Sequence, residues 1–91
     1  MPLSVLLAPA AAKDLDLLPS ERRDQVLADV EAYAANPSAS GRVKPLRGFK
    51  PPLLRLRVGD YRVLFRAVGA ELHVYRVIDR KVLDHTLKRL K

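Results

Sequence analysis

Hydrophobic positions in the N-terminal part of the chain follow a short apolar run and then helical spacing. Residues Leu3–Ala8 are apolar and end at a proline, which predicts a short buried strand. Apolar side chains recur at helical spacing over Ala10–Leu18 and again over Ser20–Ala35, and each segment is followed by a proline within two residues. Ser20 is placed to cap the second helix. The pattern predicts a strand and then a helical hairpin with one buried face.

In the second half of the chain, apolar and polar residues alternate with a period of two. This alternation predicts three successive strands over Leu54–Val58, Tyr61–Ala67 and Leu72–Ile78, separated by turns that each contain a glycine. Helical spacing returns over Val82–Leu90, where basic residues follow at the C-terminal end. The chain therefore ends in a short amphipathic helix.

The segment 37–52, between these two halves, holds four of the seven prolines and two of the four glycines, with basic residues between them. It predicts an irregular, exposed connection. The fold class expected is α+β in the order β-α-α-β-β-β-α. A small, mostly antiparallel sheet carries the N-terminal helical hairpin on one face, and a short C-terminal helix follows. The 91 residues suffice for one domain, 1–91.

Composition narrows the possible functions. Hydrophobic residues make up 48% of the chain, which excludes intrinsic disorder, and the absence of cysteine excludes disulfides and thiolate metal sites. Apolar runs of only a few residues predict no membrane span, and no secretory signal precedes them, so a cytoplasmic protein is expected. An aromatic share of 5% without tryptophan argues against an extended base-stacking platform.

The net charge of +7 is concentrated in one part of the sequence. Residues 1–41 hold three bases against six acids, whereas residues 42–66 hold eight bases against one acid. Alternation places four arginines on one face of the predicted hairpin: Arg55, Arg57, Arg62 and Arg66. Like charges held this close favour a bound phosphate. The alternative is that these charges only keep an exposed strand from aggregating.

Two motifs carry a resemblance to a known family. The first is Lys44-Pro45-Leu46-Arg47-Gly48, and the second is Leu54-Arg55-Leu56-Arg57-Val58-Gly59-Asp60-Tyr61-Arg62-Val63-Leu64-Phe65. The second is similar to the R-x-R-x-G-D-Y-R-V-x-Y hairpin of the RelE/ParE superfamily of bacterial toxins, with Phe65 where tyrosine is common. The resemblance extends from about Val5 to Leu83 and implies the α+β fold already predicted from periodicity.

The resemblance implies a toxin of a type II toxin–antitoxin system. Proteins similar to RelE cleave ribosome-bound messenger RNA, and relatives similar to ParE inhibit DNA gyrase. The short helical hairpin and the arginine-rich strands favour the RelE type. A basic relative that only binds RNA or its antitoxin is a further alternative. The implied partners are a cognate antitoxin, ribosome-bound mRNA and rRNA, and the oligomeric state would be set by the antitoxin complex.

The implied chemistry needs no metal and no cofactor. The ribose 2′-OH attacks the adjacent phosphorus, which requires a general base, a general acid and cations for the phosphate oxygens. The resemblance assigns Arg62 to the phosphate, Arg80 to transition-state stabilisation, and Arg55 to positioning or proton transfer. The further phosphate-binding candidates are Arg57, Lys81, Arg66, Arg47, Lys50 and Lys44.

The chain departs from the family pattern at the acid/base group. Many relatives have a tyrosine about four residues after the arginine that corresponds to Arg80, where this chain has Asp84, followed by His85. Imidazole is suited to proton transfer near neutral pH, so His85 is the candidate acid or base. The alternative is that His85 is simply a surface residue of the helix. His73, on a strand beside the hairpin, is a weaker candidate for the same role.

Overall fold

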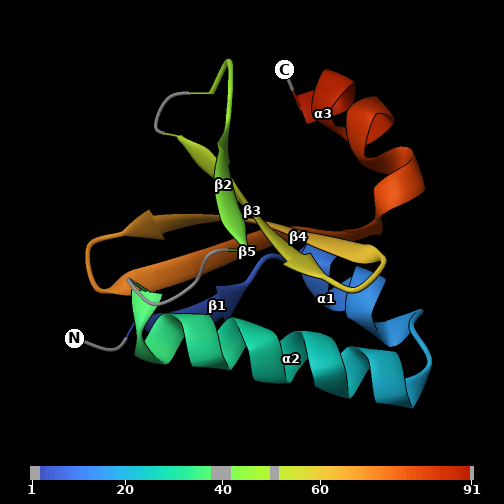
Figure 1. Ribbon diagram of the computed structural model, residues 1–91, viewed down its shortest axis with the longest axis horizontal. Coiled ribbons are helices and arrows are strands. Elements are labelled where there is room, and N and C mark those ends of the chain that lie inside the picture. Colours follow the sequence, from blue (N-terminus) through green and yellow to red (C-terminus); the bar gives the residue numbers. More distant parts are fainter. Residues whose placement is uncertain (1–2, 38–41, 50–51, 91) are drawn as a thin grey trace.

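The computed structural model describes residues 3–37, 42–49 and 52–90. Along the chain the elements are β1 (Ser4–Leu7), α1 (Pro9–Asp16), α2 (Ser20–Ala35), β2 (Val43–Leu46), β3 (Leu53–Val58), β4 (Tyr61–Val68), β5 (Glu71–Asp79), the 3-10 turn η2 (Arg80–Val82) and α3 (Leu83–Leu90). The strands form one five-stranded sheet in the order β1-β5-β4-β3-β2 (Figure 1). β1 pairs with β5 in parallel, and the other three pairs are antiparallel.

The predicted α+β class, with its helical hairpin and short C-terminal helix, is confirmed, but three local predictions are wrong. The segment predicted to be irregular contains strand β2, in which Pro45 is tolerated because β2 lies at the edge of the sheet. The first strand is not buried: it forms the opposite edge, with Leu6 42% and Leu7 41% exposed. Helix α2 has Pro19 at its N-cap, without a side-chain cap, so Ser20 does not cap it.

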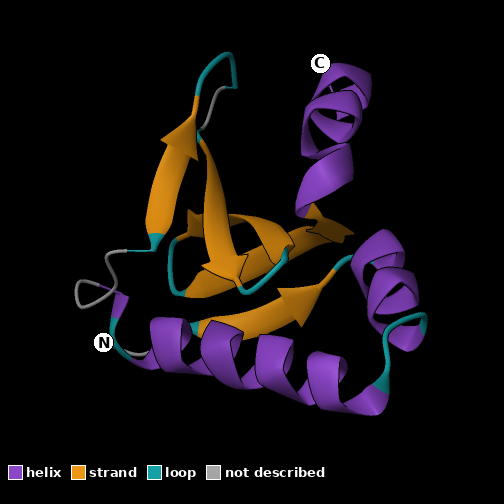
Figure 2. Cartoon of the chain, turned by 45° about the vertical axis from the view of Figure 1, so that its right-hand side comes forward, coloured by secondary structure: helices purple, strands orange, loops and turns teal. Residues whose placement is uncertain are grey.

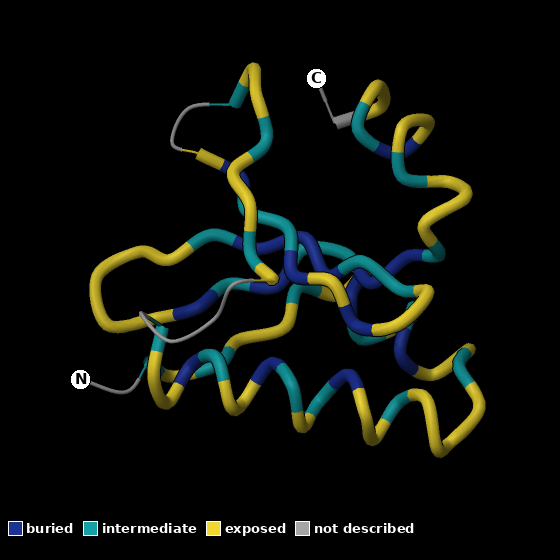
Figure 3. The backbone as a smooth tube through the Cα atoms, in the orientation of Figure 1, coloured by how far each residue is buried: buried dark blue, intermediate teal, exposed yellow. Residues whose placement is uncertain are grey.

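Helices α1 and α2 cover one face of the sheet (Figures 1 and 2). Figure 3 shows the buried positions recurring along the side of α2 that faces the strands. Ala11 and Leu15 of α1 and Val26, Val30 and Ala34 of α2 pack here against residues of β3, β4 and β5. The ring of Tyr33 meets Phe65 edge-on at 5.2 Å between centroids, which places this tyrosine in a structural role. This is the main hydrophobic core.

A smaller apolar cluster lies on the opposite face of the sheet. Leu53, Leu64 and Ile78 are buried there, and Leu83 and Leu87 of α3 pack against them. Helix α3 accordingly lies on the side of the sheet away from α2 (Figures 1 and 2). Over the described ranges, every helix is too short or too polar to cross a membrane.

Asp14 of α1 secures the part of β5 that extends beyond β1. The pairing of β1 ends at Leu7 opposite Val74, so the next residues of β5 lack a strand partner on that side. The Asp14 carboxylate accepts hydrogen bonds from the backbone N–H of Val77 at 2.9 Å and from Arg76 Nε at 2.7 Å and Nη2 at 3.1 Å. Bonding to this carboxylate raises the pKa of Arg76 above its ordinary value. One side chain thus joins a helix to a strand edge.

We predict that Asp14→Ala lowers the free energy of unfolding by about 1–3 kcal/mol, because it leaves a strand N–H and a half-buried guanidinium unpaired. Urea unfolding of the two proteins measures this difference. Asp16→Ala, an exposed position on the same helix, is the control and should change stability by less than about 0.5 kcal/mol. Equal effects of the two substitutions would contradict the assigned role of Asp14.

Candidate functional site

The pairing of β3 with β4 gathers cationic side chains on the face opposite α1 and α2. Arg57 lies directly across from Arg62, and Arg55 lies two pairs further along, across from Leu64. Apolar residues at the alternate positions of both strands belong to the main core, so the arginines must project from the other face. Among the described residues, no carboxylate forms an ion pair with Arg55, Arg57 or Arg62.

Arg62 lies at the centre of this group and its guanidinium is fixed by the hairpin turn. Nη1 donates hydrogen bonds of 2.9 Å each to the carbonyl oxygens of Gly59 and Tyr61. Gly59 adopts φ 57°, a left-handed conformation that glycine accommodates without steric cost and that turns its carbonyl at this tight corner. The pKa of Arg62 is lowered, first by burial and then by the positive charges of Arg55, Arg57 and Arg80. The negative charge of Asp60 has a smaller, opposite effect on this pKa.

Arg80 is held beside this group by the same turn. Its backbone N–H donates to the carbonyl oxygen of Asp60 at 2.8 Å, and its Nε lies 3.7 Å from Asp60 Oδ1. The side chain of Asp79 accepts a hydrogen bond from the N–H of Lys81 at 2.8 Å and so caps the η2 turn. Arg80 and Lys81 are both exposed. Two aspartates therefore shape the backbone that presents these two cations.

A basic pocket of about 170 Å³ opens beside the arginine group. Its lining residues are Arg42, Lys44, Arg55 and Arg57, contributed by β3 and by β2 with the residue before it. The Nε atom of Arg55 is buried and has no hydrogen-bond partner among the described residues. Arg42 is held in place by an ion pair of 2.9 Å with Asp29 of α2. A buried donor in a cationic wall is the arrangement that an anionic oxygen satisfies.

The other predicted site residues lie apart from this group. Arg66 is on the same face of β4 but beyond Leu64, and its guanidinium carbon lies 5.5 Å from the centre of the Tyr75 ring. Arg47 is exposed just after β2, and Lys50 falls outside the described residues. His85 is exposed on α3, and no hydrogen bond or ion pair joins it to a described residue. His73 lies 3.2 Å from Glu71, in an ion pair if protonated.

Sequence reasoning missed two contributors to the site. Arg42 lines the basic pocket, and it would have been found had β2 been predicted, because it precedes Lys44 by two residues and therefore shares its face. Asp60 appears in the sequence only as a member of the second motif, and its contact with Arg80 has no local signal. Within the described ranges, no three acidic or histidine side chains cluster in a way that could hold a metal ion.

Comparisons of the sequence and of the fold with known proteins both match proteins of toxin–antitoxin systems. The family model described as "ParE toxin of type II toxin-antitoxin system, parDE" matches residues 5–83. The fold is similar to that of the RelE chain in the archaeal RelE–RelB complex of Pyrococcus horikoshii OT3, with a TM-score of 0.73 at 24% identity over 88% of this chain and 97% of the other. No curated protein sequence matches the chain.

Two further solved structures are similar at slightly higher identity. The RelB–RelE antitoxin–toxin complex of Methanococcus jannaschii matches with a TM-score of 0.68 at 26% identity, over 89% of this chain and 96% of the other. The toxin–antitoxin complex RelBE2 of Mycobacterium tuberculosis matches with a TM-score of 0.65 at 28% identity, over 88% and 100%. The chain therefore spans nearly the whole length of each of these structures.

The arrangement of Arg57 opposite Arg62 predicts that repulsion between the two charges lowers the stability of the free protein. Arg57→Gln should raise the free energy of unfolding by about 0.2–1 kcal/mol at low ionic strength, because it removes repulsion between directly opposed like charges. The gain should shrink as salt screens the charges. Arg22→Gln on α2 removes the same net charge and is the control. A gain as large in the control would show that net charge alone is responsible.

Proposed function

The chain belongs to the ParE toxin family of type II toxin–antitoxin systems within the RelE/ParE superfamily, and from its likeness to RelE structures and the arginines of its hairpin we propose that it is a ribosome-dependent mRNA endoribonuclease. The observation that carries this proposal is the placement of Arg55, Arg57 and Arg62 on one face of the β3–β4 hairpin, with Arg80 bonded to Asp60 of its turn. Such a cluster is suited to a phosphate that gains negative charge in a transition state. The proposed reaction is the attack of a ribose 2′-OH on the adjacent phosphorus, without a metal.

The bond between the ribose 2′-oxygen and phosphorus forms as the bond to the 5′-oxygen of the next nucleotide breaks. The products are a 2′,3′-cyclic phosphate and a free 5′-OH. Arg62 is the proposed clamp on the non-bridging oxygens, because the carbonyls of Gly59 and Tyr61 already hold its guanidinium in one orientation. A donor that needs no reorganisation stabilises the developing charge more effectively than a mobile one.

Arg80 and the basic pocket extend this binding surface. Asp60 holds Arg80 at the end of the hairpin, where it is placed to stabilise the same phosphate from another side. The pocket between β2 and β3 offers Lys44, Arg55 and Arg57 to a neighbouring phosphate, with the unpartnered Nε of Arg55 as one donor. Lys81, Arg66, Arg47 and Lys50 remain candidates for contacts to RNA.

His85 is the proposed proton-transfer residue. It lies five residues after Arg80, in the first turn of α3, and its side chain is exposed to solvent rather than held in the core. The exposed position leaves the ring accessible to an RNA strand bound across the arginines. Arginine is a poor proton donor at neutral pH, so cleavage of RNA at this site needs another side chain, such as an imidazole, for proton transfer.

The proposal also includes partners and location. The RelE structures that this chain resembles are complexes with RelB antitoxins, which supports a cognate antitoxin as the protein partner. The remaining proposed partners are ribosome-bound mRNA and rRNA, which places the activity in the cytoplasm. The stoichiometry of the resting state would follow from the antitoxin complex.

We expect Arg62→Ala to reduce mRNA cleavage by about 10²–10³-fold, because it removes the pre-oriented donor from the phosphate. Arg62→Lys should recover little, since a point charge replaces a planar fork. Cleavage is measured by mapping 5′ ends of a message in a cell-free translation reaction. Arg22→Ala, an exposed arginine of α2, is the matched control and should cleave at the wild-type rate.

Inhibition of DNA gyrase is the second candidate, because the matching family model is described as a ParE toxin. A gyrase supercoiling assay with the same protein separates the two activities. Intact messages together with trapped or inhibited gyrase would replace the ribonuclease proposal by this one. Salt-sensitive RNA binding without effect in either assay would indicate a purely binding protein.

A separate prediction concerns proton transfer. His85→Gly should lower the cleavage rate by about 10²-fold or more, and added imidazole should restore part of it, because the small molecule can occupy the vacated position. Asp84→Gly, at the adjacent exposed residue, is the control: its rate should neither fall as far nor respond to imidazole. A wild-type rate in His85→Gly would remove this residue from the mechanism.

A further inference from the structure

A path of neighbouring cations leads from Arg62 to the β2 edge of the sheet. Arg62 of β4 is paired with Arg57 of β3. Two residues further along β3, Arg55 is paired with Lys44 of β2. Paired residues of antiparallel strands project from the same face of a sheet, and so do residues two apart on one strand. Each cation is therefore the neighbour of the next, and the path ends at the basic pocket between β2 and β3.

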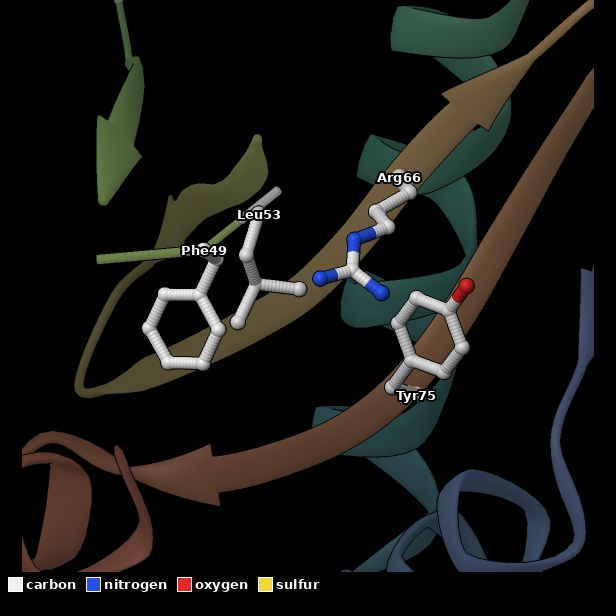
Figure 4. A pocket seen from close by; sticks show the side chains of 4 residues that line it. All are labelled: Phe49, Leu53, Arg66 and Tyr75. Carbon is white, nitrogen blue, oxygen red and sulfur yellow. The ribbon is translucent and has the colours of Figure 1, made fainter. Parts of the chain in front are cut away.

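The same face offers no comparable path along β4. Leu64, the next residue after Arg62 on this face of the strand, is fully buried in the apolar cluster on which α3 packs. Beyond it lies a cavity of about 110 Å³, lined by Phe49, Leu53, Arg66 and Tyr75. Figure 4 shows the Arg66 guanidinium extending between Leu53 and the ring of Tyr75, so this arginine already covers the ring. The cationic contacts beside Arg62 therefore continue across the strands.

The chemistry of the basic pocket selects a single anionic group. Its volume of about 170 Å³ is below the roughly 300–1,000 Å³ of pockets that hold whole small molecules, and each described residue that lines it is cationic. Arg42 already has Asp29 as a partner. Lys44, Arg55 and Arg57 form no ion pair with a described carboxylate. The Nε atom of Arg55 is buried without a described hydrogen-bond partner, which is costly until an acceptor reaches it.

Arg57 connects the pocket with Arg62. It lines the pocket and is also paired with Arg62, so anions bound at the two positions lie next to each other. The backbone of a nucleic acid carries one negative charge per nucleotide, and lysine and arginine are its usual partners. A strand held by one phosphate at Arg62 therefore brings its next phosphate to the pocket. A single carboxylate from a protein partner would account for the pocket but not for its continuity with Arg62.

We propose that the basic pocket is a phosphate subsite that binds the phosphodiester next to the one held at Arg62, and that it directs the RNA strand across β4 and β3 toward β2. The inference rests on the proposed function in taking RNA as the ligand and Arg62 as the contact of the cleaved phosphate. It adds a path for the strand. Of the two roles that the family resemblance implies for Arg55, positioning or proton transfer, the subsite corresponds to positioning, with Lys44 as its partner in that role.

The test is binding of 2′-O-methyl RNA trinucleotides without terminal phosphates, which carry two phosphodiesters and cannot be cleaved because they lack the attacking hydroxyl. One trinucleotide has both linkages charged, and two others each have one linkage replaced by an uncharged methylphosphonate. The fully charged form should bind the full-length wild-type protein about tenfold more tightly than either partly neutral form. Lys44→Gln and Arg55→Gln should bind all three forms with nearly equal affinity, because only one phosphate then has a site.

A matched control and two independent variants keep the test decisive. Arg22→Gln, at an exposed arginine of α2, removes the same charge and should retain the tenfold difference. Lys44 is exposed on an edge strand, so Lys44→Gln still gives an answer if Arg55→Gln does not fold, as judged by circular dichroism. Each pocket variant should also lower the dependence of log Kd on log salt concentration by about 0.7, the value for one lost phosphate contact on a single strand.

The inference is overturned if the wild-type protein binds the three trinucleotides equally, if none of them binds, or if the pocket variants keep the tenfold difference. It is also overturned if these variants leave RNA binding unchanged and weaken only the binding of inorganic phosphate or of the cognate antitoxin, which would assign the pocket to a free anion or to an acidic side chain. A tenfold difference together with intact mRNA in translation reactions would refute the ribonuclease proposal and leave the subsite standing.

Discussion

The pairing of β3 with β4 is the constraint on which both the core and the site depend. Leu56, Val58, Val63 and Phe65 are buried on one face, and burial of such a side chain contributes about 1.5–3 kcal/mol. That face must meet α1 and α2, so the register that satisfies it also sets Arg57 directly opposite Arg62. Repulsion between opposed charges on a sheet amounts to at most about 1 kcal/mol, and the apolar face prevails. The fold can therefore hold an electrostatically unfavourable cluster in place.

Contacts with the hairpin turn fix the positions of two cations in this cluster. Gly59 and Tyr61 present carbonyls to Arg62, and Asp60 contacts Arg80 through both its backbone and its side chain. The turn residues of the family-like motif thus orient the two cations at the end of the sheet. The contacts of Arg62 are local in sequence and form whenever the hairpin forms, whereas the contact of Asp60 with Arg80 also needs β5 to pair with β4. The geometry of the site therefore depends on the turn and on the strand beside it.

Sequence periodicity predicted the elements whose signals are local, and it failed where the determining contact is distant. The alternation in β3 and β4 revealed the shared face of Arg55, Arg57 and Arg62. β2 was missed because Pro45 and its charged neighbours read as a loop, and it is a strand only because β3 lies beside it. Arg66 was grouped with the other arginines, since nothing local shows that Leu64 and Tyr75 separate it from them.

The apolar cluster on the arginine face explains how one small sheet surface carries separate features. Leu53, Leu64 and Ile78 interrupt the basic surface, so that the group around Arg62 lies on one side and the cavity beside Arg66 lies on the other. The same three residues bind Leu83 and Leu87, which fixes α3 over the sheet and with it the position of His85. A polar replacement in this cluster would bury an unpaired polar group beneath α3 and weaken the packing of that helix. Its three buried side chains therefore determine the spacing between the phosphate-binding arginines, the aromatic cavity and the C-terminal helix.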